Sequence, residues 1–86
     1  MSDLAHRFGD AQARIKQATS LGNDVLLELY ALYKQATAGD ATGPRPGMLD
    51  LRGRAKHDAW AARKGMTADA AMTAYIALVA RHVANG

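Results

Sequence analysis

Hydrophobic side chains recur along the chain at alternating steps of three and four residues, the spacing of one face of an amphipathic helix. Ser2 is suited to cap the first such segment, and Asp3 places a negative charge in its first turn. Residues 19–22 are expected to end this helix. Its hydrophobic face consists of Leu4, Phe8, Ala11, Ile15 and Ala18.

A second helix is predicted over residues 24–38, with Asn23 as its N-cap and Asp24 in its first turn. Gly39 suits a left-handed C-terminal cap, because glycine adopts positive φ without steric cost. Residues 39–50 then form the one long connection, whose glycines and prolines exclude continued helix. Such a connection is often functional; the alternative is a spacer that lets two helices run in the same direction.

The third predicted helix, residues 51–64, carries positive charge along one side. Asp50 is its expected N-cap, and Gly65 ends it. Two interpretations of this side stay open: a solvated basic face, or one on which Trp60 is a core anchor with its indole N–H bonded at the edge. The residues at i, i+4, i+8 and i+11 are Arg52, Lys56, Trp60 and Arg63.

The fourth predicted helix begins after the N-cap Thr67, with Asp69 in its first turn, and runs to the end of the chain. Four helices, three connections and no credible strand predict an all-α fold, a small four-helix bundle. The hydrophobic face of the fourth helix consists of Met72, Tyr75, Ile76, Val79 and Val83.

The length and composition are those of one small domain, residues 1–86. Hydrophobic residues make up 49% of the chain, enough for a core, and the absence of cysteine excludes disulfides and thiolate metal sites. Residues 1–10 carry acids and no apolar run, so no signal peptide is expected. No segment approaches the length of a membrane span, and we expect a cytoplasmic protein.

The positive charge is concentrated in one third of the chain. Residues 45–64 hold six basic and two acidic side chains, a net charge of +4, whereas the remaining residues hold five basic and six acidic ones, a net charge of −1. Localised positive charge indicates an anionic partner, such as a phosphate ligand, a nucleic acid or a lipid headgroup.

Chemistry beyond binding is not indicated. His6, His57 and His82 are dispersed along the chain without the paired spacing of a metal site, and no nucleophile or glycine-rich phosphate loop has the required context. We therefore expect no enzyme activity and no cofactor, and any phosphate binding must use side chains.

Tyr30, Tyr33 and Lys34 share one face of the second predicted helix. Two phenols and an ammonium group would suit a ligand with a flat ring and an anionic group. The alternative is a core stripe whose tyrosine hydroxyls reach water and whose lysine is solvated. These residues alone favour the second interpretation.

Three longer motifs change that balance. They read YALYKQATAGD at residues 30–40, RPGMLDLRGRAKHDAW at residues 45–60 and DAAMTAYI at residues 69–76. In this order and spacing they resemble the acyl-coenzyme A-binding protein family, over almost the whole chain. The resemblance implies an up-down-down-up four-helix bundle that binds medium- to long-chain acyl-CoA thioesters without chemistry, and that buffers and transports them.

The resemblance also implies which residues bind the ligand. In the family, the two tyrosines and the lysine of the YxxYK element contact the adenine and the ribose 3′-phosphate, and the lysine of KxDAW serves the phosphates. A first-helix lysine, followed here by a loop one residue shorter, a basic position at the start of the third helix and a tyrosine of the fourth complete the set. The matching residues are Tyr30, Tyr33, Lys34, Lys56, Lys16, Arg52 and Tyr75.

Physical chemistry agrees with this assignment. Tyr33 can stack on adenine, and Lys34 and Lys56 can form charge-assisted hydrogen bonds with phosphate. An alkyl tail gains about 0.8 kcal/mol for each buried CH₂ group, so an apolar groove between helices would supply much of the affinity.

The chain departs from the family pattern at His57, where the family usually has tryptophan, and more mildly at Leu51, where it often has phenylalanine. An imidazole in place of an indole removes apolar area, which would weaken ligand binding if the side chain borders the groove. The alternative is a surface histidine without ligand contact.

Two other function classes fit parts of the sequence. A nucleic-acid-binding helical domain would use the same basic segment, but net charge is only +3 and nucleic acid is not the expected partner. A helical bundle that has lost ligand binding would explain His57. The expected partners are acyl-CoA thioesters, with a monomeric state, no integral membrane association, and transient contact with membranes or enzymes that use acyl-CoA.

Overall fold

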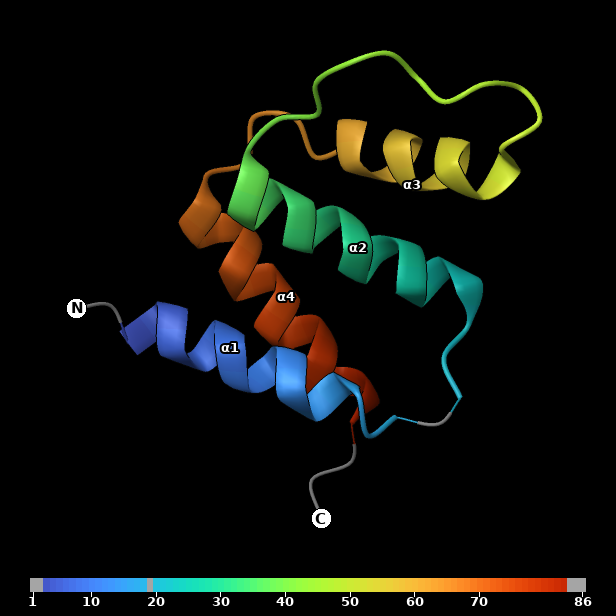
Figure 1. Ribbon diagram of the computed structural model, residues 1–86. Helices are drawn as coiled ribbons and strands as arrows, with labels where there is room; N and C mark the ends of the chain where they lie inside the picture. Colours follow the sequence, from blue (N-terminus) through green and yellow to red (C-terminus); the bar gives the residue numbers. More distant parts are fainter. Residues whose placement is uncertain (1–2, 19, 84–86) are drawn as a thin grey trace.

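The computed structural model describes residues 3–18 and 20–83, and in this part of the chain all regular structure is helical (Figure 1). The N-cap predicted at Ser2 and the residue Thr19 lie outside the described residues. The helices are α1 (Asp3–Ile15), α2 (Asn23–Ala38), α3 (Leu51–Ala61) and α4 (Ala68–His82). The predicted all-α, four-helix fold is thereby confirmed.

The helices form the up-down-down-up arrangement. Helix α4 packs against both α1 and α2, whereas α3 packs against α2. The connection over residues 39–50 arches past α3 and returns the chain to its far end, so that α2 and α3 run in the same direction (Figure 1). The connection thus lets the two helices run in the same direction, as the spacer interpretation expected, and it leaves α3 attached to one side of the molecule.

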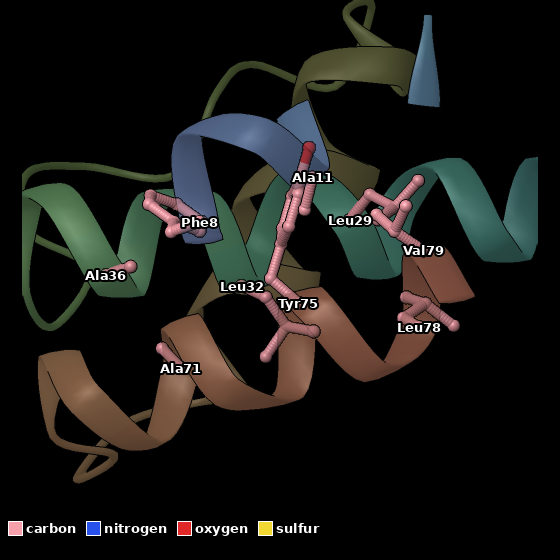
Figure 2. Close-up of a cluster of buried hydrophobic side chains, with 9 residues drawn as sticks. All are labelled: Phe8, Ala11, Leu29, Leu32, Ala36, Ala71, Tyr75, Leu78 and Val79. Carbon is pink, nitrogen blue, oxygen red and sulfur yellow. The ribbon is translucent and has the colours of Figure 1, made fainter. Parts of the chain in front are cut away.

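A hydrophobic core fills the space between α1, α2 and α4 (Figure 2). Leu32 and Val79 are almost completely buried, and the ring of Phe8 meets that of Tyr75 edge to face, with centroids 5.0 Å apart. Helix α3 has no fully buried residue. The core members are Phe8, Ala11, Leu29, Leu32, Ala36, Ala71, Tyr75, Leu78 and Val79.

Three predicted helix boundaries need correction. Helix α1 ends at Ile15, not at residue 18, because i→i+3 hydrogen bonds tighten the chain there, such as that from the Ala18 N–H to the Ile15 oxygen. Asn23 is the first helical residue of α2 and not its N-cap; extended Gly22 takes the cap position without a side-chain bond. Helix α3 ends at Ala61, and the next residues form tight turns.

The predicted caps of α3 and α4 are confirmed. The Asp50 carboxylate accepts the Gly53 N–H at 2.9 Å, and the Thr67 hydroxyl accepts the Ala70 N–H at 3.0 Å. Gly39 has the expected positive φ of 83°, but its ψ of −155° lies outside the left-handed helical region. Only glycine adopts this combination of φ and ψ readily. The prediction of a glycine cap was therefore right in residue type and wrong in conformation.

A polar cluster joins the end of α2 to the turn before α4. The buried Gln35 amide donates to the Asp40 carboxylate at 2.7 Å and to the Met66 carbonyl at 3.0 Å, and the Gly65 N–H donates to the same Asp40 oxygen at 2.9 Å. The Gly65 N–H, followed by Gln35, lowers the pKa of Asp40 below its ordinary value. These bonds fix where the chain leaves α2 and where it enters α4.

Among the described residues, none of the helices is long and apolar enough to cross a lipid bilayer.

Candidate functional site

Helices α2 and α3 face each other through two lysines and two aromatic rings. The Lys34 ammonium of α2 lies 4.9 Å from the ring centroid of Trp60 in α3. In the reverse sense, the Lys56 ammonium of α3 lies 5.4 Å from the ring centroid of Tyr30 in α2. Both distances are within cation–π range. The structure therefore brings together three of the predicted site residues: Tyr30, Lys34 and Lys56.

Trp60 is fixed beneath Lys34 by a hydrogen bond. Its indole N–H donates to the Gly39 carbonyl at 2.7 Å, and its side chain is half-buried. The interpretation of Trp60 as an anchor with its N–H bonded at an edge thus describes its position better than a wholly solvated face does. A flat, fixed ring holds the Lys34 ammonium near the end of α2, at the side facing α3.

Arg63 does not extend the basic side of α3. It follows the end of the helix, and its guanidinium pairs with Glu28 of α2 at 2.8 Å. The predicted four-residue stripe was wrong in this member, because the helix stops before it. Arg63 serves instead to hold α3 against α2.

Tyr33 points away from α3 and toward α1. Its ring stacks on that of Phe8, with centroids 6.2 Å apart and planes inclined by 27°, and 40% of the residue stays exposed. Tyr75 lies close by on α4 but is only 6% exposed. Burial, and secondarily the charge of a neighbouring Tyr33 phenolate, raise the pKa of Tyr75. Tyr33 thus offers an accessible ring surface, whereas Tyr75 is part of the core.

A groove of about 330 Å³ opens between the first halves of α2 and α3. Ligand pockets usually enclose roughly 300–1,000 Å³, so this groove is at the small end of that range. It combines an apolar lining with two cations, Arg52 and Lys56. Its lining residues are Asn23, Leu26, Leu27, Leu51, Arg52, Ala55 and Lys56.

The groove contains residues that sequence analysis did not assign to a site. The expected apolar groove between helices is present, but Leu26, Leu27 and Ala55 were not named as its lining. One signal was available: Leu26 and Leu27 are adjacent, so both cannot point into the same core. In the structure Leu26 is 48% exposed and Leu51 75% exposed. Exposed leucines beside cations indicate a surface for an amphiphilic anion.

Lys16 is the most separate of the predicted site residues. It is exposed and lies just beyond the end of α1. In residues 3–18 and 20–83, no hydrogen bond, ion pair or ring contact joins it to the other six.

His57 is half-buried in α3, and its ring meets Trp60 at a centroid distance of 6.4 Å. Both ring nitrogens are shielded from solvent and lack a hydrogen-bond partner among the described residues. His57 is not part of the groove lining. This position favours the alternative without direct ligand contact, but the half-buried ring is not the surface side chain that this alternative expected. Within the same described residues, no group of three histidine or acidic side chains could hold a metal ion.

Comparison with known proteins gives a consistent result. The family model described as "Acyl CoA binding protein" matches residues 5–79. The acyl-CoA-binding protein homolog 1 of Caenorhabditis elegans is 53% identical over 79 residues, covering 91% of this chain and 92% of that protein. The homolog from Manduca sexta is 48% identical over 84 residues, covering 95% and 93%.

Solved structures agree with the sequence comparison. The crystal structure of Oryza sativa acyl-CoA-binding protein 2 superposes with a TM-score of 0.89 at 39% identity, over 92% of this chain and 87% of that one. The solution structure of the acyl CoA binding protein from Babesia bovis gives a TM-score of 0.79 at 39% identity, over 91% of each chain.

Proposed function

Because this chain belongs to the acyl-CoA-binding protein family, we propose that it binds medium- to long-chain acyl-CoA esters, and that it buffers and transports them without changing them. The observation that carries this proposal is the pairing of two features between α2 and α3. Lysines stand beside aromatic rings, and an apolar groove with two cations lies next to them. An acyl-CoA has the matching parts: a flat base, phosphates and an alkyl chain.

Each part of the ligand has a proposed place. The exposed ring of Tyr33 and the ring of Tyr30 offer stacking surfaces to the adenine. Lys34 and Lys56 supply charge-assisted hydrogen bonds to the phosphates, including the ribose 3′-phosphate. Arg52 adds positive charge at the groove.

The alkyl chain would lie in the groove against Leu26, Leu27 and Leu51. Each CH₂ group buried there contributes about 0.8 kcal/mol, so a chain of several carbons outweighs any single polar contact. The polar head and the apolar tail would thus be bound by the same pair of helices.

Lys16 and Tyr75 remain in the proposed ligand-binding set. The exposed ammonium of Lys16 would reach a phosphate from beyond the end of α1. Tyr75 supports the ring of Phe8, on which Tyr33 stacks, so its role would be chiefly to position the adenine surface.

We further propose that residues 1–86 act as one domain, as a monomer, in the cytoplasm, and without catalysis, metal or other cofactor. The expected partners are acyl-CoA esters and, transiently, membranes or enzymes that use acyl-CoA; nucleic acid is not among them. Thioester hydrolysis above background, abolished by a His57→Ala substitution, would contradict the non-catalytic part of this proposal.

Calorimetric titration tests the ligand class directly. Palmitoyl-CoA should bind tightly, free CoA more weakly, and palmitate hardly at all, since palmitate lacks the groups that the lysines and tyrosines recognise. If palmitate binds as tightly as palmitoyl-CoA in this titration, the assignment of the head-group site is wrong.

A further inference from the structure

The groove between α2 and α3 is short. Both helices begin at the same side of the molecule, so the groove has its outer end there and its inner end where Lys56 lies over the ring of Tyr30 (Figure 1). Tyr30 follows Asn23, the first residue of α2, by seven positions. At a rise of about 1.5 Å per residue, this stretch of helix is about 10 Å long. The groove therefore offers an alkyl chain a path of limited length.

Polar side chains border this path at both ends. Lys56 stands at the inner end. At the outer end the lining includes Asn23, the first residue of α2, and Arg52, the second residue of α3. Leu51, beside Arg52, is the last apolar wall and is itself 75% exposed. An alkyl chain that extended beyond the outer end would leave the groove. The apolar residues between the two ends are Leu26, Leu27 and Ala55.

The dimensions of the groove limit the number of carbons that it can hold. An extended peptide advances about 3.5 Å for each residue, which has three main-chain bonds, so an extended alkyl chain advances about 1.2 Å for each carbon. A path of about 10 Å then accommodates about eight or nine carbons. The volume gives a similar number. A methylene group needs about as much room as a water molecule, about 30 Å³, so the groove of about 330 Å³ holds about eleven.

We propose that the groove limits the length of acyl chain that contributes to affinity, and that Asn23 sets this limit. The thioester lies at the inner end, near Lys56, and the first eight to eleven or so carbons fill the groove. Further carbons pass Asn23 into solvent, because covering its amide with an alkyl chain would cost the amide its contacts with water. The inference rests on the proposed function and deepens it, since it names medium-length acyl chains as those that fill the site.

Calorimetric titration with a series of saturated acyl-CoA esters, from hexanoyl- to octadecanoyl-CoA, tests the limit. The dissociation constant of the wild type should fall about two- to fourfold for each added CH₂ group as far as decanoyl- or dodecanoyl-CoA, because burial in an open groove contributes up to the full increment of a buried CH₂ group. From dodecanoyl- to octadecanoyl-CoA, the dissociation constant should change by less than about twofold in total, since the added carbons remain in water. Palmitoyl-CoA should therefore bind tightly, but no more tightly than dodecanoyl-CoA.

Asn23→Leu should move the limit to longer chains. Asn23 is exposed, and Gly22 takes the cap position of α2, so the substitution leaves the helix and the core in place. The added leucine extends the apolar lining, and palmitoyl-CoA should bind at least about fivefold more tightly than to the wild type, with little change for decanoyl-CoA. Two controls should keep the wild-type limit: Asn23→Asp, which preserves size and polarity, and Ala77→Leu, which adds a leucine at an exposed position of α4 outside the groove.

Two outcomes would overturn the proposal. If the wild-type affinity rises by the same factor per carbon from dodecanoyl- to octadecanoyl-CoA, the acyl site extends past the groove, toward the exposed Met48 and Leu49, which do not line it. If Asn23→Leu is folded, as its thermal midpoint shows, and reaches its limit at the same chain length as the wild type, Asn23 does not set the limit. The wild-type series tests the limit without any substitution. Failure of the wild type to bind any of the esters would instead remove the proposed function.

Discussion

The two sides of α2 are held to their neighbours by different forces. Toward α1 and α4, α2 contributes Leu29, Leu32 and Ala36 to a core in which every member is at most 9% exposed. Toward α3, it presents Tyr30 and Lys34 to a helix without fully buried residues. One side is a hydrophobic core, and the other is a layer of cation–π, polar and ionic contacts.

The difference separates stability from recognition. Hydrophobic burial is the dominant favourable term in folding, so the core side of α2 holds the bundle together. The α2–α3 side consists of groups that can exchange their partners for phosphates and an alkyl chain with little loss to the core. A ligand that binds only the folded state stabilises that state by mass action. Because the ligand would contact the α2–α3 side, its binding should stabilise this weaker layer most.

The largest effect is expected from Leu32→Ala, which breaks the core side. Leu32 is 1% exposed, and large-to-small substitutions at such sites cost roughly 2–5 kcal/mol. Domains have a total stability of about 5–15 kcal/mol, so most of the Leu32→Ala protein should still be folded. Its apparent affinity for palmitoyl-CoA should fall only in proportion to the loss of folded protein. Urea unfolding measures the loss.

Leu51→Ala is the matched control for the other side of α2. Leu51 is exposed and lines the groove, so the free energy of unfolding should hardly change, while affinity for palmitoyl-CoA should fall. If Leu51→Ala destabilised the fold as much as Leu32→Ala does, the division into a core and a recognition layer would be untenable.

Lys34→Ala should produce the next largest effect, confined to recognition. Removing a hydrogen bond to a charged group costs about 1.5–3 kcal/mol, so affinity for palmitoyl-CoA should fall by that amount. Affinity for the ester of dephospho-CoA, which lacks the 3′-phosphate, should change much less. An equal loss with both ligands would show that Lys34 serves another part of the ligand.

The fold was predictable because its determinants are local. The helices with clear apolar periodicity and capping residues, such as Asp50 and Thr67, appeared where expected. The wrong predictions concern helix ends, whose positions depend on backbone geometry. Asn23 is the first residue of the helix that it was expected to cap, and α3 ends before Arg63. The spacing of apolar residues does not predict the tight turns at which a helix ends.

The site was predictable only in part. The resemblance named Lys34 and Lys56, and the structure adds that each stands over an aromatic ring of the facing helix. Helical periodicity placed Tyr33 beside Tyr30, yet the two rings face different helices, since positions three apart are displaced by about 60° around the axis. The groove depends on how α2 and α3 pack, which no single segment specifies.

His57→Phe should sharpen the comparison by strengthening the weaker layer. Both imidazole nitrogens are shielded and unpaired among the described residues, and an unsatisfied buried polar group costs roughly 1–3 kcal/mol. An apolar ring of similar size should recover about 1 kcal/mol of that in the free energy of unfolding. Affinity for palmitoyl-CoA should stay within about twofold, because His57 does not line the groove.

His57→Gln, which keeps a polar side chain, is the control and should give no such gain in urea unfolding. A His57→Phe protein less stable than the wild type would mean that the imidazole has a polar partner in solution.

The smallest effect concerns the polar cluster that ends α2. The Gly65 N–H, then Gln35 and more weakly Lys64, lower the pKa of Asp40 from its ordinary value of 3.8. A carboxyl group with a lowered pKa in the folded state stabilises it fully above the unfolded pKa, and this contribution is lost as pH falls through the folded pKa. The wild type should therefore lose stability as the pH drops below about 4.

Asp40→Asn isolates that contribution. Asparagine keeps an oxygen that can accept from Gly65 and Gln35, but it removes the charge, so the variant should be slightly less stable at neutral pH and its stability should depend less on pH below about 4. Asp10→Asn is the control, since Asp10 is exposed and lies 3.5 Å from the exposed His6, away from the polar cluster. Urea unfolding at a series of pH values decides the matter. The cluster joins α2 to the turn before α4. If the stability of Asp40→Asn depends on pH in the same way as that of the wild type, the charge of Asp40 does not contribute to this junction.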